Sequence, residues 1–289
     1  NLTYKLNSGH NIPLIGLGTF QIHGEQLIHN VLDLALKAGY RHIDTAVVYR
    51  NEHHIGKALK ELLPKYNLKR EDIFITSKLI AQANQNEKHV ESLIRESLVN
   101  LQTDYIDLYL IHWPGVSGIP VSHPDNIKYR RSTWEAFKKL YAEGKCRSIG
   151  VSNYTVKHLN ELLTNCGDVR PAVNQVEWHP HYYQPELLEL CRNENIFLQA
   201  YSSLGSSNYS NLRHDPIVVK IATKLGKSTS QILLRWALQQ NIGIIPKARS
   251  QAHIEENFDL SFHIPNEDMQ TLNNMRNDEK YAWNPNSVI

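Results

Sequence analysis

Several side chains that could take part in catalysis stand at or just after the ends of short apolar runs. Asp44 ends the second run and Tyr49 comes five residues later. Lys78 stands near the end of the third run, and His112 ends the fourth. The later runs bring Ser152 and Asn153, then Asn174, Gln175 and Glu177, then Tyr201 and Ser202, and finally Lys247. A purely structural protein has no need of polar side chains at all of these positions.

Asp44, Tyr49, Lys78 and His112 make chemical sense as one catalytic site. A tyrosine is a weak acid with an ordinary pKa of about 10, and a lysine ammonium beside it favours the phenolate and lowers that pKa. An aspartate can hold the lysine in place, and a histidine can donate a hydrogen bond to the oxygen that receives the proton. This equipment suits the reduction of a carbonyl group. Because it supplies a proton and no hydride, we expect a cofactor to bring the hydride.

The apolar runs themselves predict strands that are buried on both faces. They are short, nearly continuous in apolar character and rich in β-branched or aromatic residues. The eight runs cover residues 14–20, 40–44, 73–79, 106–112, 148–153, 172–178, 196–202 and 242–247. Apolar residues with a 3.6-residue period lie between them, as in residues 27–36, and predict amphipathic helices.

The alternation of strands and helices predicts an α/β fold, a (β/α)8 TIM barrel. Eight strand–helix units fit a barrel of about 250 residues, whose active site lies at the carboxyl ends of the strands, where the polar residues stand. The first thirteen residues predict a β-hairpin that turns at Ser8 and Gly9 and closes the bottom of the barrel. No linker or shift in composition divides the chain, so we expect a single domain over residues 1–289.

Composition and charge exclude several classes of protein. Apolar residues make up 41% of the 289 residues, which is enough for a substantial core and excludes global disorder. The net charge is +2 and no basic face stands out, which argues against a nucleic-acid or membrane partner. Three cysteines without a CxxC pair, and no signal-like or spanning apolar segment, favour a cytoplasmic protein. We expect a monomer that acts on a small molecule.

Eight segments of the sequence together resemble the aldo-keto reductase family. Residues 39–56, 147–154 and 245–257 are similar to the three signature segments of that family, and the first of them shows no departure. Between these lie GLGTF, ITSKL, LIHWP, VNQVEWHP and QAYSSLG, in the order that the family has. The resemblance covers essentially the whole chain.

The resemblance implies a barrel that reduces aldehydes and ketones with NADPH. It implies Tyr49 as the proton donor, Lys78 and Asp44 as the pair that tunes it, and His112 as the residue that orients the carbonyl. The implied cofactor-binding residues are Thr19, Asp44, Ser152, Asn153, Gln175, Tyr201, Ser202, Leu204, Ser206, Lys247, Ala248, Arg249, His253, Glu256 and Asn257. Among them Tyr201 would stack on the nicotinamide, and Ser152, Asn153 and Gln175 would hold its carboxamide. Those from Lys247 onward would surround the adenosine 2′-phosphate and the adenine.

The substrate pocket is less sharply defined than the cofactor site. Phe20, Val48, Trp113 and Trp283 fit as its apolar walls beside His112, although core packing is nearly as good a reading of Phe20 and Val48. The loop over residues 114–132 and the tail after the last helix are short. We therefore expect small or extended carbonyl substrates, with Trp283 able to fold over the pocket mouth.

Two positions depart from the family's pattern at the expected 2′-phosphate site. The family usually has Ser or Thr after the lysine and Arg six residues beyond it, whereas this chain has Ala248 and His253. Arg249 is a candidate substitute charge. We expect a preference for NADPH over NADH that is narrower than usual and weakens as a histidine loses its proton above about pH 6.5.

Other functions remain possible on the sequence alone. A Schiff-base lyase would use Lys78 as its nucleophile, and a non-catalytic binding protein could be built on the same barrel. Tyr141 and Lys145 form a Tyr-x-x-x-Lys pair, but no glycine-rich dinucleotide fingerprint precedes them. The pairs His53–His54 and His179–His181 lack the cysteines or carboxylate pattern of a metal site, so we expect no metal.

Overall fold

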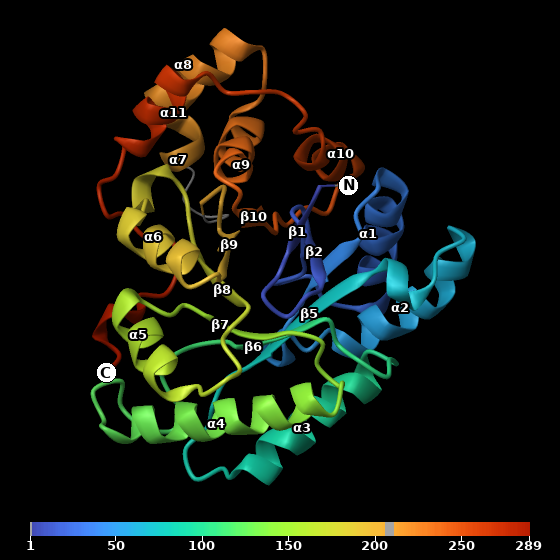
Figure 1. Ribbon diagram of the computed structural model, residues 1–289. Helices are drawn as coiled ribbons and strands as arrows, with labels where there is room; N and C mark the ends of the chain where they lie inside the picture. The colour runs from blue at the N-terminus through green and yellow to red at the C-terminus, as the bar shows by residue number, and fades with distance from the viewer. Residues whose placement is uncertain (1, 206–210) are drawn as a thin grey trace.

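A computed structural model describes residues 2–205 and 211–289, and in it eight parallel strands lie at the centre with helices around them (Figure 1). Each of these eight parallel strands falls inside one of the eight apolar runs, so the predicted strand positions are confirmed. The strands are β3 (Leu17–Gly18), β4 (His42–Asp44), β5 (Phe74–Leu79), β6 (Leu108–Ile111), β7 (Ile149–Ser152), β8 (Val173–Glu177), β9 (Phe197–Tyr201) and β10 (Gly243–Ile244).

The strands follow their sequence order around the barrel, and the first meets the last. Each of β3 to β10 pairs in parallel with the next. A parallel bridge between Ile15 and Ile244 joins the two edges, where Gly16 N donates to Ile244 O at 2.8 Å. Gly18 is needed at this seam because an added Cβ would lie 2.6 Å from Ile245 O. The predicted (β/α)8 barrel is confirmed.

Amphipathic helices bury one face against the outside of the strands. The predicted stripe on α1 is buried at Ile28, Val31 and Leu36, and α1 ends where Gly39 takes a left-handed conformation with φ of 105°. The helices are α1 (Glu25–Ala38), α2 (Glu52–Lys65), α3 (Glu87–Asn100), α4 (Asp125–Ala142), α5 (Val156–Asn165), α6 (Pro185–Asn193), α7 (Asn211–His214), α8 (Pro216–Leu225), α9 (Thr229–Gln239), α10 (Gln251–Phe258) and α11 (Asn266–Asn273). Short 3-10 turns are η1 (Val47–Tyr49), η2 (Arg70–Asp72), η3 (Pro180–Tyr182) and η4 (Pro285–Ser287).

An antiparallel hairpin of β1 (Thr3–Lys5) and β2 (Asn11–Pro13) covers one end of the barrel. Its turn contains Gly9, whose φ of 88° suits a residue without a side chain. Ser8 Oγ lies 2.6 Å from the Oγ of Ser148, just before β7, and Asn7 donates to Pro171 O, just before β8. The hairpin therefore closes the amino end of the strands, as predicted, and leaves the carboxyl end open.

Cys146, Cys166 and Cys191 are buried free thiols. Within residues 2–205 and 211–289, no helix has the length and apolar character needed to cross a bilayer.

Candidate active site

Lys78 and Asp44 form a buried ion pair at the carboxyl ends of β5 and β4. Lys78 Nζ donates to Asp44 Oδ1 at 2.5 Å and to Thr45 O at 2.9 Å, and the Lys78 side chain has no solvent exposure. The third contact of the ammonium is the Tyr49 hydroxyl, at 3.5 Å. Tyr49 ends η1, the turn that follows β4, so one short segment of chain carries both Asp44 and Tyr49. The predicted set of Asp44, Tyr49 and Lys78 is thus brought together.

Burial and charge act against each other on the Tyr49 hydroxyl. Burial raises the pKa of Tyr49, and the Lys78 ammonium lowers it by less, so the net direction is upward. The expectation of a net lowered pKa is therefore wrong, although the predicted influence of Lys78 is present. The consequence is a phenol that keeps its proton at neutral pH and has a cation beside it to stabilise the phenolate once the proton has left.

Hydrogen bonds and opposite charge act against the effect of burial on this ion pair. Burial alone would lower the pKa of Lys78, but Asp44 and Tyr49 outweigh it and the pKa is raised. Burial raises the pKa of Asp44 by more than Lys78 and the Gln175 amide lower it, so the net direction is upward. Because Asp44 accepts hydrogen bonds from Lys78 and Gln175 Nε2, the latter at 2.7 Å, the carboxylate is the form that this arrangement holds.

His112 faces Tyr49 from the end of β6. The two ring centroids are 5.8 Å apart in an edge-on arrangement, and burial with the Lys78 charge lowers the pKa of His112 to about 3. The imidazole is therefore neutral, with one nitrogen able to donate and one able to accept. Its Nδ1 is buried and has no hydrogen-bond partner in the part of the chain that the structure describes. A neutral donor beside Tyr49 fits the predicted role of orienting a carbonyl oxygen.

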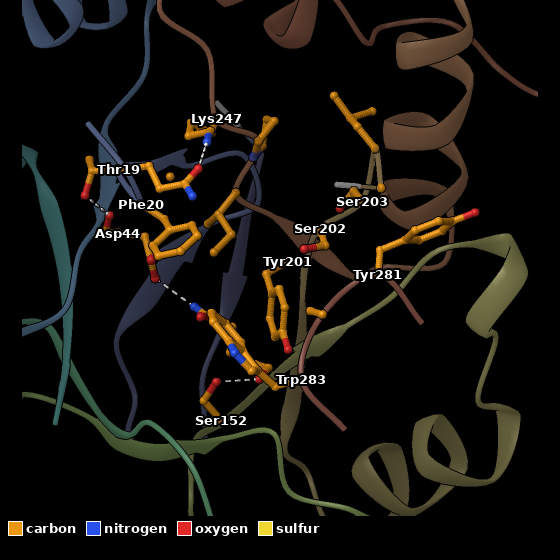
Figure 2. A pocket seen from close by; sticks show the side chains of 18 of the residues that line it. Thr19, Phe20, Asp44, Ser152, Tyr201, Ser202, Ser203, Lys247, Tyr281 and Trp283 are labelled. Carbon is orange, nitrogen blue, oxygen red and sulfur yellow. Dashed lines mark hydrogen bonds between the residues drawn. The ribbon is translucent and has the colours of Figure 1, made fainter. Parts of the chain in front are cut away.

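A cavity of about 620 Å³ opens at the carboxyl ends of the strands, above this quartet (Figure 2). In Figure 2, Thr19, Phe20 and Asp44 approach it from one side and Ser203 and Tyr281 from the other. Its lining comprises Gly18, Thr19, Phe20, Gln21, Asp44, Tyr49, His112, Ser152, Asn153, Gln175, Tyr201, Ser202, Ser203, Leu204, Gly205, Arg213, Ile245, Pro246, Lys247, Tyr281, Ala282 and Trp283. Most of the predicted cofactor residues before Lys247 are among them.

Amide and hydroxyl groups converge at the inner part of the cavity. The Tyr201 hydroxyl donates to Asn153 Oδ1 at 2.5 Å, and Asn153 Nδ2 donates to His112 O at 2.9 Å. Ser152 Oγ donates to the carbonyl of Gln175 at 2.7 Å. Asn153 has a φ of 64°, a left-handed conformation that asparagine tolerates better than most residues. The side chains that the resemblance assigns to a nicotinamide carboxamide are thus in one place.

Lys247 and Arg249 both contact Gln21, a residue of the cavity wall. Lys247 Nζ donates to Gln21 Oε1 at 3.0 Å and Arg249 Nη2 donates to Gln21 O at 2.6 Å. His253 is exposed in the first turn of α10, whose amino end Ser250 caps, while Ala248 and Asn257 are buried. Lys247 is the one of these that lines the cavity. The remaining predicted residues of this group are Glu256, which is partly exposed, and Ser206, which lies outside the described residues.

The apolar walls predicted for a substrate divide into two groups. Phe20 and Trp283 line the cavity, and their ring centroids are 5.9 Å apart in an edge-on arrangement. Phe20 also lies 5.2 Å from Tyr49, measured between ring centroids. Val48 is 50% exposed and Trp113 is partly buried, and neither of them contributes to the cavity wall.

Sequence reasoning missed several residues that line the cavity. Ser203 has a buried hydroxyl without a partner among residues 2–205 and 211–289, and Arg213 lines the cavity from α7. Tyr281 and Ala282 precede Trp283 in the chain, so the prediction for Trp283 could have been extended to them. For Arg213 the sequence offered no signal, because neither its spacing nor its neighbours set it apart.

The histidine pairs do not build a metal site. Among the described residues, no cluster of three or more His, Cys, Asp or Glu side chains is arranged to hold a metal ion. His179 Nε2 instead contacts Glu177 Oε1 at 2.9 Å, and His181 contacts Asp215 Oδ2 at 3.0 Å and the Tyr281 hydroxyl at 2.9 Å. His179 and His181 therefore make hydrogen bonds within the protein.

Comparison with known proteins gives the same family along nearly the whole chain. A model of the aldo/keto reductase family matches residues 14–277. The chain is 39% identical to a glyoxal reductase of Bacillus subtilis over 99% of its length and 97% of that protein. It is 40% identical to aldose reductase B of Dictyostelium discoideum over 94% of its length and 92% of that protein. The crystal structure of an aldo-keto reductase enzyme from a Medee basin deep-sea metagenome library covers 100% of both chains at a TM-score of 0.88 and 38% identity.

Proposed function

The chain belongs to the aldo/keto reductase family, and from this we propose that it reduces aldehydes and ketones to alcohols with NADPH, using Tyr49 as the proton donor. The observation that carries the proposal is the position of the Tyr49 hydroxyl. It lines the cavity, with the Lys78 ammonium 3.5 Å behind it and His112 facing it. A carbonyl oxygen bound between Tyr49 and His112 meets two donors.

The chain's own residues account for the movement of the proton. His112 donates a hydrogen bond that polarises and orients the carbonyl, and Tyr49 gives its proton to the oxygen as charge develops there. Lys78, held by Asp44, stabilises the phenolate that remains until water restores the proton. A bound reduced nicotinamide supplies the hydride to the carbonyl carbon. The alcohol then leaves, and the protein is unchanged.

The cavity has groups suited to such a cofactor. Ser152, Asn153 and Gln175 bring amide and hydroxyl groups to its inner part, and Tyr201 offers an aromatic ring. Among the described residues, the buried Ser203 hydroxyl has no hydrogen-bond partner, which suits contact with a ligand. Lys247 and Arg249 provide positive charge for the 2′-phosphate that distinguishes NADPH from NADH. Ala248 stands in place of a hydroxyl and His253 in place of a permanent charge. These two replacements make the preference for NADPH over NADH narrower.

Small or extended carbonyl compounds suit the substrate side. Phe20 and Trp283 form apolar walls, and the Trp283 side chain is 58% exposed. The printed names of two relatives, a glyoxal reductase and an aldose reductase, add dicarbonyl compounds and aldoses to the candidates.

Two other functions receive less support. A Schiff-base lyase needs a neutral, accessible lysine, whereas Lys78 has no exposed surface and directs its three N–H bonds at Asp44, Thr45 O and Tyr49. A non-catalytic binding protein on the same barrel has no need to keep Asp44, Tyr49, Lys78 and His112 together.

Oxidation of NADPH by the purified protein against a panel of aldehydes, dicarbonyls, aldoses and ketones tests the proposal. We expect turnover with part of the panel, and Tyr49→Phe to lower kcat by a factor of about 100 to 10,000 while the Kd for NADPH changes little. A Tyr49→Phe variant that retains full activity would exclude Tyr49 as the proton donor. Borohydride trapping of a carbonyl compound on Lys78 would favour the lyase instead.

A further inference from the structure

Glu177 is a buried carboxylate that the reaction described above does not use. It is the last residue of β8 and is 1% exposed. Gln175 lies two residues earlier on the same strand and therefore on the same face, where it contacts Asp44. Glu177 continues this face toward the rim of the barrel. Its partners there belong to the C-terminal segment of the chain.

Glu177 binds the start of this segment through both carboxylate oxygens. Tyr281 N donates to Oε1 at 2.5 Å, Ala282 N donates to Oε2 at 3.2 Å, and Lys280 Nζ donates to Oε2 at 2.6 Å. His179 Nε2 adds a contact to Oε1 at 2.9 Å. Four groups thus converge on one buried carboxylate, and three of them come from consecutive residues of the C-terminal segment.

The other end of the segment is bound to α5, to α4 and to the loop that precedes α4. His158 Nε2, on α5, contacts Val288 O at 2.9 Å, and Ile289 N donates to Val121 O at 3.1 Å. Arg130, on α4, donates to Ile289 O. Residues 280–289, here called the C-terminal arch, are therefore held at both ends, and Figure 1 shows the C-terminus beside α5.

Trp283 follows directly after the anchored residues Lys280, Tyr281 and Ala282. Its side chain is 58% exposed, yet its ring keeps an edge-on contact with Phe20 at 5.9 Å. Phe20 in turn lies 5.2 Å from Tyr49, so three aromatic rings lead from the mouth to the proton donor. An exposed tryptophan on an unanchored segment would not hold such a place by itself, because its ordering carries an entropic cost.

We propose that Glu177 is a positioning residue that fixes Trp283 as a preset wall of the substrate pocket and so favours carbonyl compounds with an aromatic or flat apolar group. That group would lie against Trp283 and Phe20 while the carbonyl reaches Tyr49 and His112. The proposal rests on the proposed carbonyl reduction. A small aliphatic aldehyde does not reach Trp283 and gains nothing from the arch.

Glu177→Gln keeps the size of the side chain but replaces one acceptor oxygen with a donor. With benzaldehyde we expect KM to rise about three- to tenfold, because one aromatic contact is lost. We expect kcat and the Kd for NADPH to stay within about twofold of the wild-type values. With propanal we expect KM to stay unchanged. Trp283→Ala should also raise the benzaldehyde KM, and Glu177→Gln in the Trp283→Ala background should add no further increase.

Hydrogen exchange of the cofactor-free protein provides a second readout. Glu177→Gln should speed exchange at the amides of Tyr281 and Ala282 and leave the Ile289 amide, which donates to Val121, unchanged. Asp107→Asn is the matched control, because Asp107 is also a buried acceptor of a backbone N–H, from Ile75, but lies at the amino end of β6. It should alter neither the benzaldehyde KM nor exchange in the arch.

The outcomes separate this inference from the proposed function. Wild-type protein that reduces no carbonyl compound contradicts the proposed function, and with it the inferred substrate preference. Active protein whose benzaldehyde KM is unmoved in Glu177→Gln overturns the inference alone, as does unchanged exchange at Tyr281. If Glu177→Gln does not fold, Lys280→Met removes one donor from the outer side, and it should raise the benzaldehyde KM about two- to threefold; an unchanged KM there also overturns it.

Discussion

Lys78 is a cation without solvent exposure, and the acceptors around it stabilise its buried charge. Asp44, Thr45 O and Tyr49 take up its three N–H bonds. A buried ion pair contributes little net stability compared with apolar residues, but removal of one partner leaves a buried charge uncompensated. The arrangement proposed for catalysis is therefore also a point at which the fold is vulnerable.

Lys78→Met should lower the free energy of unfolding by about 3 to 5 kcal/mol, because Asp44 remains buried without its counter-ion. Asp44→Asn combined with Lys78→Met should recover part of this loss, since no unpaired charge is left. Urea denaturation of the two variants and the wild type measures both effects. Equal stability of Lys78→Met and the wild type would show that Asp44 takes up a proton when Lys78 is absent.

His253→Arg should strengthen NADPH binding and leave NADH binding unchanged. The substitution places a permanent charge with two parallel donors beside Arg249, where the 2′-phosphate is proposed to lie. We expect the Kd for NADPH to fall about tenfold, as one charge-assisted hydrogen bond to a phosphate would give. Isothermal titration with each cofactor measures the change. His263→Arg makes the same substitution at another exposed histidine, and an equal gain there would contradict a specific site.

At the scale of elements, the strand-and-helix pattern carried most of the prediction. Strands buried on both faces have apolar runs, so all eight strands could be located. Their lengths could not be predicted. The first run, 14–20, contains only Leu17–Gly18 as strand, and the last, 242–247, contains only Gly243–Ile244. These two runs meet at the seam of the barrel, where the chain soon turns into the loops that bear Phe20 and Lys247.

The same rule brought the proposed catalytic residues together and missed the arch. Asp44, Lys78 and His112 stand at strand ends, and parallel strands bring such ends together, so their meeting could be predicted. The contact of Glu177 with Tyr281 joins residues 104 positions apart, outside any strand pairing. Local patterns carry no information on where a terminal segment docks. The predicted lowering of the Tyr49 pKa was wrong for a related reason, because the depth of burial that raises this pKa is a property of the packed structure.

The contact between α2 and α3 depends on a glycine. A Cβ added to Gly56 in α2 would lie 2.4 Å from Asn100 O and 2.6 Å from Leu101 C. Alanine in a helix is normally favoured over glycine by up to about 1 kcal/mol, but a clash with backbone atoms costs about 1 to 3 kcal/mol. Gly56→Ala should therefore lower the melting temperature, as differential scanning calorimetry would measure. Lys60→Ala, at an exposed position of the same helix, should change it little, and a rise in Gly56→Ala would contradict the close packing.

At the scale of the whole molecule, the two ends of the chain cover opposite ends of the barrel. The β1–β2 hairpin lies across the amino ends of the strands, and the C-terminal arch lies across part of the carboxyl ends. The first closure is packed with buried apolar residues such as Leu6 and Ile12. The second is held by hydrogen bonds and leaves Trp283 exposed at the cavity. This difference suits a stable floor and an accessible substrate entrance.

Three buried histidines make the stability of the whole molecule depend on pH. Burial lowers the pKa of His42 and His112 to about 3 and that of His158 to about 4, whereas an unfolded histidine titrates at about 6.5. The unfolded chain therefore binds more protons than the folded one below about pH 6.5, and stability falls as the pH falls. Each histidine accounts for about 1.4 kcal/mol between pH 7.5 and pH 5.5, so the three together account for about 4 kcal/mol.

Urea denaturation at several pH values tests this dependence, and His158→Gln isolates one contribution. His158 lies on α5 and contacts Val288 O, away from the Asp44–Lys78 pair, so its replacement does not touch the catalytic charges. The variant should lose about 1.4 kcal/mol of the change in stability between pH 7.5 and pH 5.5, whatever its stability at pH 7.5. Carboxyl groups whose pKa burial raises, such as Glu52 and Asp107, favour the folded state at lower pH and act in the same way in both proteins. Parallel curves for the two proteins would show that His158 is protonated in the folded state, in contradiction to its buried position.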